Sequence, residues 1–400
     1  MIDLFAGCGG LSEGFMQTGK YSEIAAVEWL KPQVDTLRHR LSTKWGEQDA
    51  DDRVMHFDIQ REDELFGGWK NDGEFGCGKG LDYYVNQSNG IDIIIGGPPC
   101  QAYSIAGRVR DEHGMKNDYR NYLFEHYLSV VKRYQPKLFV FENVPGIMSA
   151  APDGTLITEK IQKEFESIGY EIIADLHKAL VNASDFGVPQ NRSRVVIVGL
   201  NKSMYPDAQS VLQHFYRDLL VKYRVKKKVT VREAIGDLPK CLPLFDEESH
   251  KKHISHTTPE CEISWHIPRY NNLRDMDTFR ILEEDVESGR RIYDSKKISE
   301  LYEEKVGSKS PIHRYHVLEP DEPSTTIIAH LYKDGNRFIH YDSQQQRTIT
   351  VREAARLQSF PDDFDFIGNR GSAYQMIGNA VPVLLAKSIA CAIFELLEEG

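Results

Sequence analysis

Over residues 1–199, short apolar runs alternate with helical stretches, and this alternation is the feature that most constrains the fold. The clearest run is Ile-Asp-Ile-Ile-Ile at residues 91–95. Its β-branched, apolar composition is typical of a buried parallel strand. Strands that alternate with helices predict a mainly parallel sheet covered by helices on both faces. We therefore expect an α/β fold.

A rigid loop follows the strand at residues 91–95. Two glycines and two prolines, residues 96–99, end the strand abruptly, and Cys100 comes directly after them. In an open α/β sheet, this end of a strand presents residues to a ligand. A lone cysteine is more often a small buried side chain than a reactive one. Cys100 by itself therefore indicates no particular chemistry.

Three successive strand ends carry residues suited to a nucleoside. A glycine-rich turn at residues 5–10 follows the first strand, Glu28 ends the second, and Asp58 follows the third. Glycines permit a tight turn and a close approach to a ligand, and an acidic residue can accept hydrogen bonds from ribose hydroxyls. The glycine spacing is G-x-G-G rather than G-x-G-x-x-G, so a single adenosyl group fits better than a dinucleotide. This spacing argues against a nucleotide-dependent oxidoreductase.

Further charged residues follow later strands. Glu142 ends the strand at residues 137–141, and Arg192 and Arg194 lie two apart, on one face of an extended segment. Residues 105–118 are polar and basic, which favours a lid. Residues 60–90 are polar and glycine-rich, and we expect little core of their own.

The strand–helix alternation ends near residue 200. We predict one domain from residues 1–199 and 372–400, and a smaller domain from residues 200–371. A capping-box start at Thr350 and an apolar helix at residues 383–398 mark the return to regular structure. The cysteines and histidines of the smaller domain match no paired metal-ligand spacing, so we predict no metal site.

Composition indicates which partners and which cellular compartment suit the chain. The formal net charge of −11 argues against indiscriminate binding to nucleic acid, although a local basic face remains compatible with it. No apolar run reaches about 18 residues, which predicts no membrane span. Six scattered cysteines are typical of a reducing compartment. We therefore expect a cytoplasmic protein.

Six motifs in this order resemble those of the cytosine-C5 DNA methyltransferases of the bacterial restriction–modification type. They are Asp-Leu-Phe-Ala-Gly-x-Gly-Gly at residues 3–10, Pro-Pro-Cys-Gln-x-x-Ser at 98–104, Glu-Asn-Val at 142–144, Gln-x-Arg-x-Arg at 190–194, the helix start at 350–361 and Gly-Asn-x-Val-Pro at 378–382. The resemblance implies a Rossmann-like S-adenosylmethionine-dependent methyltransferase domain with a smaller mixed α+β target-recognition domain.

The resemblance also implies a mechanism. Cys100 would add to C6 of a cytosine flipped out of duplex DNA, which activates C5 toward the methyl group of S-adenosylmethionine. Glu142 would hydrogen-bond or protonate N3, and Arg194, with Arg192 beside it, would hold O2. These four residues are the catalytic set that we predict.

By the same resemblance, the remaining site residues divide into two groups. The cofactor group is Phe5, Gly7, Gly9, Glu28, Trp29, Asp58, Ile59, Pro98, Leu123, Asn379 and Val381. The DNA group is Ser104, Arg108 and Arg120. We expect a monomer that acts on double-stranded DNA, with a cognate restriction endonuclease as partner. Two alternatives are a tRNA cytosine-C5 methyltransferase and a catalytically silent DNA-binding module.

Overall fold

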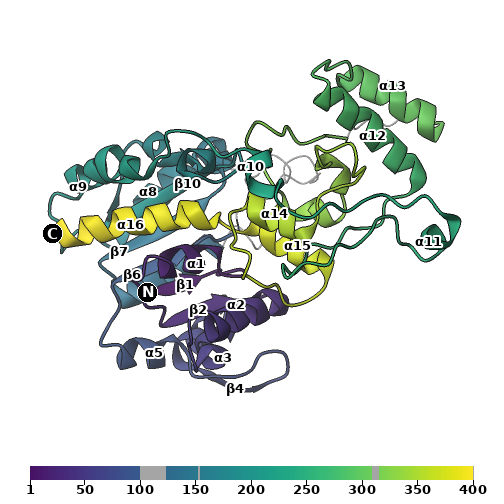
Figure 1. Cartoon of the computed structure of the whole chain (residues 1–400). Helices are drawn as coiled ribbons and strands as arrows, with labels where there is room; N and C mark the ends of the chain where they lie inside the picture. Colours follow the sequence, from purple (N-terminus) through teal and green to yellow (C-terminus); the bar gives the residue numbers. More distant parts are fainter. Residues whose placement is uncertain (100–122, 152–153, 309–314, 400) are drawn as a thin grey trace. The chain divides into compact units, whose positions relative to one another are not determined.

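The computed structural model describes residues 1–99, 123–151, 154–308 and 315–399, and it divides into two compact units (Figure 1). Unit 1 comprises residues 1–186, 193–226 and 380–400, and unit 2 comprises residues 187–192 and 227–379. The boundaries differ from those that we predicted, because residues 200–226 belong to unit 1 and residues 372–379 to unit 2. The assignment of a function to each part stays a prediction.

Unit 1 is built on a sheet of eight strands, as far as the described residues show. The strand order is β3-β2-β1-β6-β7-β10-β8, and β9 also pairs with β10. Strands β3 to β7 along this order run parallel, whereas β10 is antiparallel to both of its neighbours. The α/β class that we predicted is confirmed. The strands are β1 (Ile2–Leu4), β2 (Ala25–Glu28), β3 (Val54–His56), β6 (Ile93–Gly96), β7 (Leu138–Asn143), β8 (Tyr170–Ile172), β9 (Leu180–Asn182) and β10 (Ser193–Asn201).

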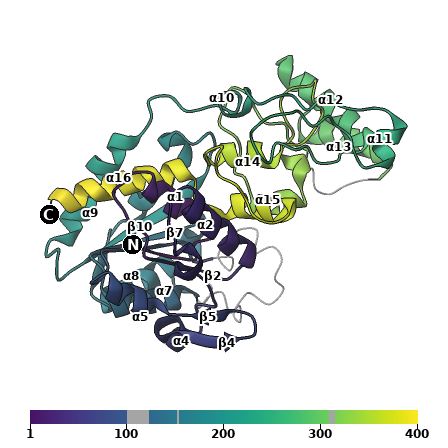
Figure 2. The same cartoon turned by 60° about the horizontal axis from the view of Figure 1, so that its bottom comes forward.

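Helices cover both faces of this sheet. Figure 2 shows α1 (Gly10–Met16) and α16 (Val383–Glu399) on one side, and α7 (Leu123–Tyr134) and α8 (Ile157–Ser167) on the other. On the second side Phe139 of β7 stacks on Phe165 of α8, with 4.1 Å between ring centroids. The further helices of unit 1 are α2 (Lys31–Thr43), α3 (Ala50–Arg53), α4 (Glu62–Gly67), α5 (Leu81–Gln87) and α9 (Ala208–His214).

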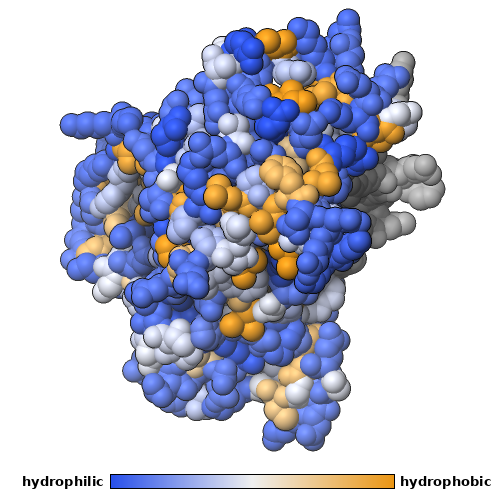
Figure 3. Space-filling view, turned by 45° about the vertical axis from the view of Figure 1, so that its right-hand side comes forward, coloured by the Kyte–Doolittle hydropathy of each residue, from blue (hydrophilic) through white to orange (hydrophobic). Residues whose placement is uncertain are grey.

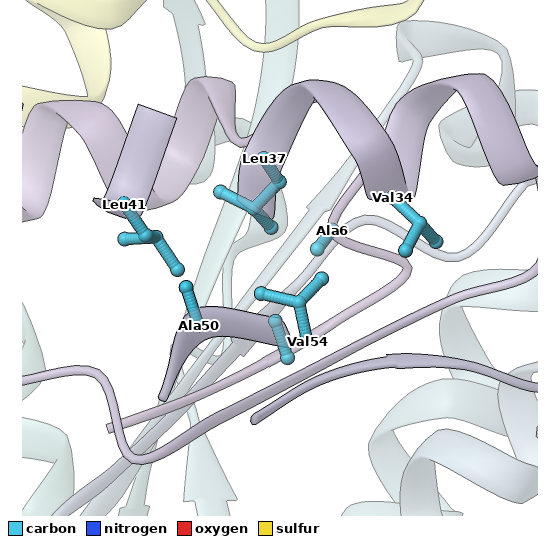
Figure 4. Close-up of a cluster of buried hydrophobic side chains, with 7 residues drawn as sticks. Ala6, Val34, Leu37, Leu41, Ala50 and Val54 are labelled. Atoms are coloured by element: carbon cyan, nitrogen blue, oxygen red, sulfur yellow. The ribbon is translucent and has the colours of Figure 1, made fainter. Parts of the chain in front are cut away.

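Helix α2 covers the edge of the sheet formed by β2 and β3. Val34, Leu37 and Leu41 of this helix pack against Ala6, which follows β1, and Val54 of β3 (Figure 4). All of these side chains are buried, and their removal from water is the main force that holds the helix on the sheet. This packing fixes the turn after β1, where the predicted cofactor residues begin.

Helix α16 is the apolar helix that we predicted near the C-terminus. Among the described residues, one segment, Arg370–Glu399, is long and apolar enough to cross a membrane. Of its most apolar 18-residue stretch, 56% is buried inside the protein. Within that segment, α16 packs on α1, where Gly14 lies against Ala386. Burial against the rest of unit 1 accounts for its apolar character.

Two further segments complete unit 1. A 3-10 turn separates β8 from β9, and at its start the Asp175 side chain accepts a hydrogen bond from the His177 backbone N–H. Residues 60–90 contribute more buried side chains than we expected, including Leu65, Phe66 and Trp69, and the aromatic partners of Phe66 and Trp69 are Tyr134 and Phe57, outside the segment. Their two-stranded sheet pairs β4 (Trp69–Asp72) with β5 (Gly76–Gly78).

The described part of unit 2 consists of helices, 3-10 turns and isolated β-bridges. The helices α10 (Val231–Ile235) and α14 (Val351–Leu357) pack together, and each begins with a Thr–Glu capping box. The remaining helices are α11 (Glu247–Lys251), α12 (Leu273–Glu287), α13 (Ser295–Val306) and α15 (Arg370–Asn379). The face of the protein in Figure 3 is mainly hydrophilic, with apolar residues in scattered groups.

Candidate active site

The turn after β1 places backbone N–H groups at the edge of the sheet. Phe5, Gly7 and Gly9 all adopt positive φ angles, of 58°, 57° and 89°. Such angles are easily reached by glycine, and the turn leads directly into α1. A Cβ atom placed on Gly7 would meet no atom within 4 Å. The turn is therefore open above Gly7, where a ligand can approach the backbone.

Glu28 at the end of β2 lies against this turn. Its Oε2 accepts a hydrogen bond from the Gly7 N–H at 2.9 Å, and its Oε1 accepts one from the Leu30 N–H at 2.8 Å. Burial raises the pKa of Glu28, and these backbone donors oppose that shift. The next residue, Trp29, is 45% exposed. A partly buried carboxylate and an exposed indole thus lie together beside the open glycine turn.

Asp58 lies just beyond β3, which ends at His56. The buried Phe57 donates its backbone N–H to the Glu28 carbonyl at 3.1 Å, which holds this strand end beside that of β2. The Asp58 Oδ1 accepts hydrogen bonds from both the backbone and side-chain nitrogens of Gln60, at 3.0 and 3.2 Å. These bonds fix the orientation of the carboxylate. The following Ile59 is buried.

Glu142 and Arg194 form an ion pair beside the loop that leads to Cys100. The Arg194 Nε lies 2.7 Å from the Glu142 Oε1, and both side chains are largely buried. Burial lowers the pKa of Arg194, whereas Glu142 acts to raise it. A Cβ placed on Gly97 would lie 2.9 Å from the Glu142 Oε2, so the carboxyl occupies the space beside this glycine. The structure thus brings together the two predicted residues Glu142 and Arg194.

Asn143 also contacts this loop, and sequence reasoning did not single it out. Its Nδ2 donates to the Pro98 carbonyl at 3.3 Å, and its Oδ1 accepts from the Val144 N–H at 2.9 Å. The buried Pro98 is thereby held against the end of β7. Asn143 directly follows Glu142, and Gly97 directly precedes Pro98. Their positions next to predicted residues were the available signal for both.

Arg192 has partners different from those of Arg194. It is buried in unit 2, where its guanidinium donates to the backbone carbonyls of Ile327 at 2.7 Å and Gly378 at 2.9 Å. Gln190 of the same segment donates to the Leu357 carbonyl. These contacts join the 187–192 segment to the rest of unit 2. A catalytic role for Arg192 stays a prediction.

The remaining predicted residues are placed as follows. Leu123 is the buried first residue of α7, Val381 is buried before α16, and Asn379 is the exposed last residue of α15. Cys100, Ser104, Arg108 and Arg120 lie outside the described residues. Among the residues that the structure does describe, no group of three or more His, Cys, Asp or Glu side chains is arranged to hold a metal ion.

The fold and its sheet edge define the class of protein. A mainly parallel sheet with a glycine turn after β1 and carboxylates after β2 and β3 is the Rossmann-like architecture of methyltransferases. Over 99% of its length, the chain aligns with a crystal structure from E. coli, a candidate DNA modification methyltransferase encoded within a prophage. That alignment covers 99% of the solved chain, with a TM-score of 0.59 and 26% identity.

Sequence comparison identifies the family. The chain belongs to the C-5 cytosine-specific DNA methylase family, which matches residues 1–395, and it is by that membership a DNA (cytosine-5-)-methyltransferase. It is 32% identical to the type II methyltransferase M.Bpa9945I of Bacillus paralicheniformis, over 99% of each protein. It is also 32% identical to the type II methyltransferase M1.HphI of Haemophilus parahaemolyticus, over 99% of the chain and 86% of that relative.

Proposed function

We propose that this protein methylates C5 of a flipped-out cytosine within a specific duplex DNA sequence, through a covalent bond between Cys100 and C6. The observation that carries the proposal is the Glu142–Arg194 ion pair beside Gly97 and Pro98. Gly97, which lies against the Glu142 carboxyl, is followed by Pro98, Pro99 and then Cys100 in the sequence. The loop beside this charged pair, which can contact a pyrimidine, therefore leads within three residues to a cysteine nucleophile.

The residues at the ends of β1, β2 and β3 fit S-adenosylmethionine. The Glu28 carboxylate accepts two backbone N–H groups and retains lone pairs for ribose hydroxyls. The exposed Trp29 offers an aromatic face for adenine, and the fixed Asp58 carboxylate offers an acceptor for the adenine amino group. We assign the cofactor to these residues and to the open turn at Gly7. When bound, S-adenosylmethionine supplies the methyl group.

The protein's own residues would then act in sequence on the cytosine. The Cys100 thiolate forms a bond to C6 as the C5–C6 double bond opens, and the electron pair shifts toward N3 and O2. Glu142 hydrogen-bonds or protonates N3, and the positive charge of Arg194 stabilises O2. After methylation of C5, a base removes the C5 proton. The electron pair re-forms the C5–C6 double bond, and the bond to the Cys100 sulfur breaks to release the thiolate.

Duplex DNA is the substrate that we propose, because the family is that of the C-5 cytosine-specific DNA methylases and the relatives are type II methyltransferases. The base must leave the helix to meet Cys100, and we assign Ser104, Arg108 and Arg120 to contacts with the opened duplex. We assign reading of the target sequence to unit 2. We further propose that the chain acts as a monomer in the bacterial cytoplasm or nucleoid, beside an endonuclease that reads the same sequence.

Methyl transfer with purified protein tests this proposal. We expect label from S-adenosylmethionine to enter duplex DNA and not tRNA, with activity lost in C100A and retained in C261A, which alters an exposed cysteine. We expect Glu142→Gln to lower kcat by about 10²–10⁴-fold. Bisulfite sequencing of the methylated DNA would then give the recognition sequence. Transfer to tRNA but not DNA, or full activity of C100A, would contradict the proposal.

A further inference from the structure

Residues 62–90 form an insertion between β3 and β6 that the mechanism above does not use. It consists of α4, the β4–β5 hairpin and α5, and we call it the α4–α5 insertion. Its buried Trp69 stacks on Phe57, with ring centroids 3.8 Å apart and an angle of 22° between planes. Phe75 of the hairpin turn packs edge-on against the Phe57 ring, with 5.3 Å between ring centroids. The insertion therefore encloses the residue that precedes Asp58.

Arg61 connects the Asp58 turn to the hairpin a second time. Its backbone N–H donates to the Asp58 carbonyl at 3.1 Å, which closes the turn. Its guanidinium lies 4.9 Å from the Phe57 ring centroid and forms an ion pair with Asp72 of β4 at 2.7 Å. Asp72 in turn accepts the Phe75 N–H at 2.9 Å. The hairpin thus contacts the Asp58 turn in two ways, through aromatic packing on Phe57 and through the ion pair between Asp72 and Arg61.

The other side of the insertion contacts α7, whose first residue is Leu123. Glu62 of α4 accepts hydrogen bonds from His126 Nδ1 at 2.6 Å and from Ser129 Oγ at 2.7 Å. Arg133 of α7 donates through two nitrogens to the Asp82 carboxylate of α5. The α4–α5 insertion therefore contacts both the Asp58 turn and helix α7, whose first residue, Leu123, is also assigned to the cofactor.

We propose that the α4–α5 insertion positions the Asp58 turn for the adenine end of the cofactor, with Trp69 as the principal positioning residue. The inference rests on the proposed cofactor site. Phe57 is held to β2 by its backbone and to Trp69 by its ring, so the direction of the next side chain depends on both. Removing the Trp69 ring leaves a space into which Phe57 can turn. The Asp58 turn, together with the carboxylate that Gln60 holds, can then shift as a whole away from the adenine position.

The affinity of the full-length protein for S-adenosylhomocysteine, measured by calorimetry without DNA, tests this inference. We expect W69A to raise the dissociation constant about tenfold, as loss of a supporting contact behind a ligand-binding residue commonly does. At saturating S-adenosylmethionine, kcat should stay within about twofold of the wild type, because the defect lies in ground-state binding. W69F retains an aromatic ring and should restore most of the affinity.

The matched control is Y83A, which removes an exposed aromatic ring of the same insertion that does not contact Phe57. We expect Y83A to bind S-adenosylhomocysteine as the wild type does. Hydrogen exchange in the absence of any cofactor gives a second readout. The Arg61 amide, which is bonded to the Asp58 carbonyl, should exchange faster in W69A than in Y83A.

Three outcomes would overturn the inference. The first is wild-type affinity in folded W69A, and the second is an equal loss of affinity in W69A and Y83A. If W69A does not fold, Asp72→Asn, which removes the ion pair with Arg61, carries the test with an expected rise of about threefold in the dissociation constant. The third outcome is unchanged affinity in that variant. No binding by the wild type would instead overturn the proposed cofactor site, and this inference with it.

Discussion

Gly97 shows how one missing side chain shapes the candidate active site. A Cβ on residue 97 would lie 2.9 Å from the Glu142 Oε2, which is closer than ordinary contact allows. We predict that Gly97→Ala displaces the Glu142 carboxyl by a few tenths of an ångström and lowers kcat by about tenfold, because a displacement of about 1 Å in a catalytic group costs about 10²-fold. Steady-state kinetics measure it. Gly73→Ala is the control, since no atom lies within 4 Å of the added Cβ there. Equal activity in both variants would contradict the placement of Glu142.

Asp3, Ser12 and Glu23 form a buried polar cluster that holds a proton. The Ser12 hydroxyl lies within hydrogen-bonding distance of both the Asp3 and Glu23 carboxyls. One hydroxyl hydrogen serves only one acceptor, so one of the carboxyls must be protonated to donate to the Ser12 oxygen. Burial is the main cause that raises the pKa of Glu23 to about 7, and it also raises the pKa of Asp3.

This cluster predicts a pH dependence of stability. A carboxyl whose pKa is higher in the folded than in the unfolded state favours folding while it is protonated, and this contribution is lost as the pH rises. The free energy of unfolding should therefore fall between about pH 4.5 and pH 7. Glu23→Gln should make that fall shallower and add roughly 1–3 kcal/mol at neutral pH, while the buried Asp3 keeps its own contribution. Denaturant titrations at several pH values measure this.

Glu159→Gln, at an exposed position of α8, serves as the control for the Glu23 prediction. It should leave the pH profile of the wild type unchanged. A profile for Glu23→Gln that falls as steeply as that of the wild type from pH 4.5 to pH 7 would show that Glu23 does not carry the proton.

At the scale of elements, α10 and α14 offer a matched pair of helix starts. Both begin Thr-Val-Arg-Glu-Ala and both have complete capping boxes. Glu353 in α14 is buried and pairs with Arg347 through two hydrogen bonds, at 2.6 and 2.7 Å. Burial acts to raise the pKa of Glu353, but Arg347 outweighs it and lowers the pKa well below its usual value. Glu233 in α10 instead pairs with the exposed Lys227.

We predict that Glu353→Gln destabilises the protein by roughly 3–5 kcal/mol, because it leaves the Arg347 charge buried without its partner. The equivalent change in α10, Glu233→Gln, should have little effect, since exposed ion pairs contribute little. Chemical denaturation compares the two variants directly. Similar losses of stability in both variants would contradict this prediction. They would mean that the loss comes from the capping box that each variant alters, and not from the buried ion pair.

The sequence predicted the elements of the sheet well where local pattern decides them. The buried strands β6 and β7 and helix α16 follow from unbroken apolar composition, and the α14 capping box follows from Thr350 and Glu353. The burial of side chains in the 60–90 region was underestimated because they pack on residues outside it, as Trp69 of the hairpin stacks on Phe57. Spacing along the chain does not reveal such a pairing.

The candidate site was predictable to a similar degree. The residues at strand ends were found, since parallel strands bring those ends to one edge of the sheet. The partners of those residues were not found. Arg192 and Arg194 lie two apart in sequence, yet one contacts backbone carbonyls in unit 2 and the other contacts Glu142 in unit 1. Arg192 belongs to unit 2 because it contacts residues that are distant in the sequence, such as Ile327 and Gly378. Local pattern does not reveal these contacts.

At the scale of the whole molecule, the proposed methyl transfer depends on a covalent bond between Cys100 and the target base. Duplex DNA in which every cytosine carries fluorine at C5 tests it without knowledge of the recognition sequence. Release of Cys100 requires loss of a proton from C5, and fluorine cannot leave in that way, so the adduct should persist. We predict a protein–DNA complex that survives denaturing electrophoresis, requires S-adenosylmethionine and is absent for C100A. An adduct that forms equally with C100A, or normal methylation of ordinary DNA with no adduct on the fluorinated duplex, would contradict the central claim.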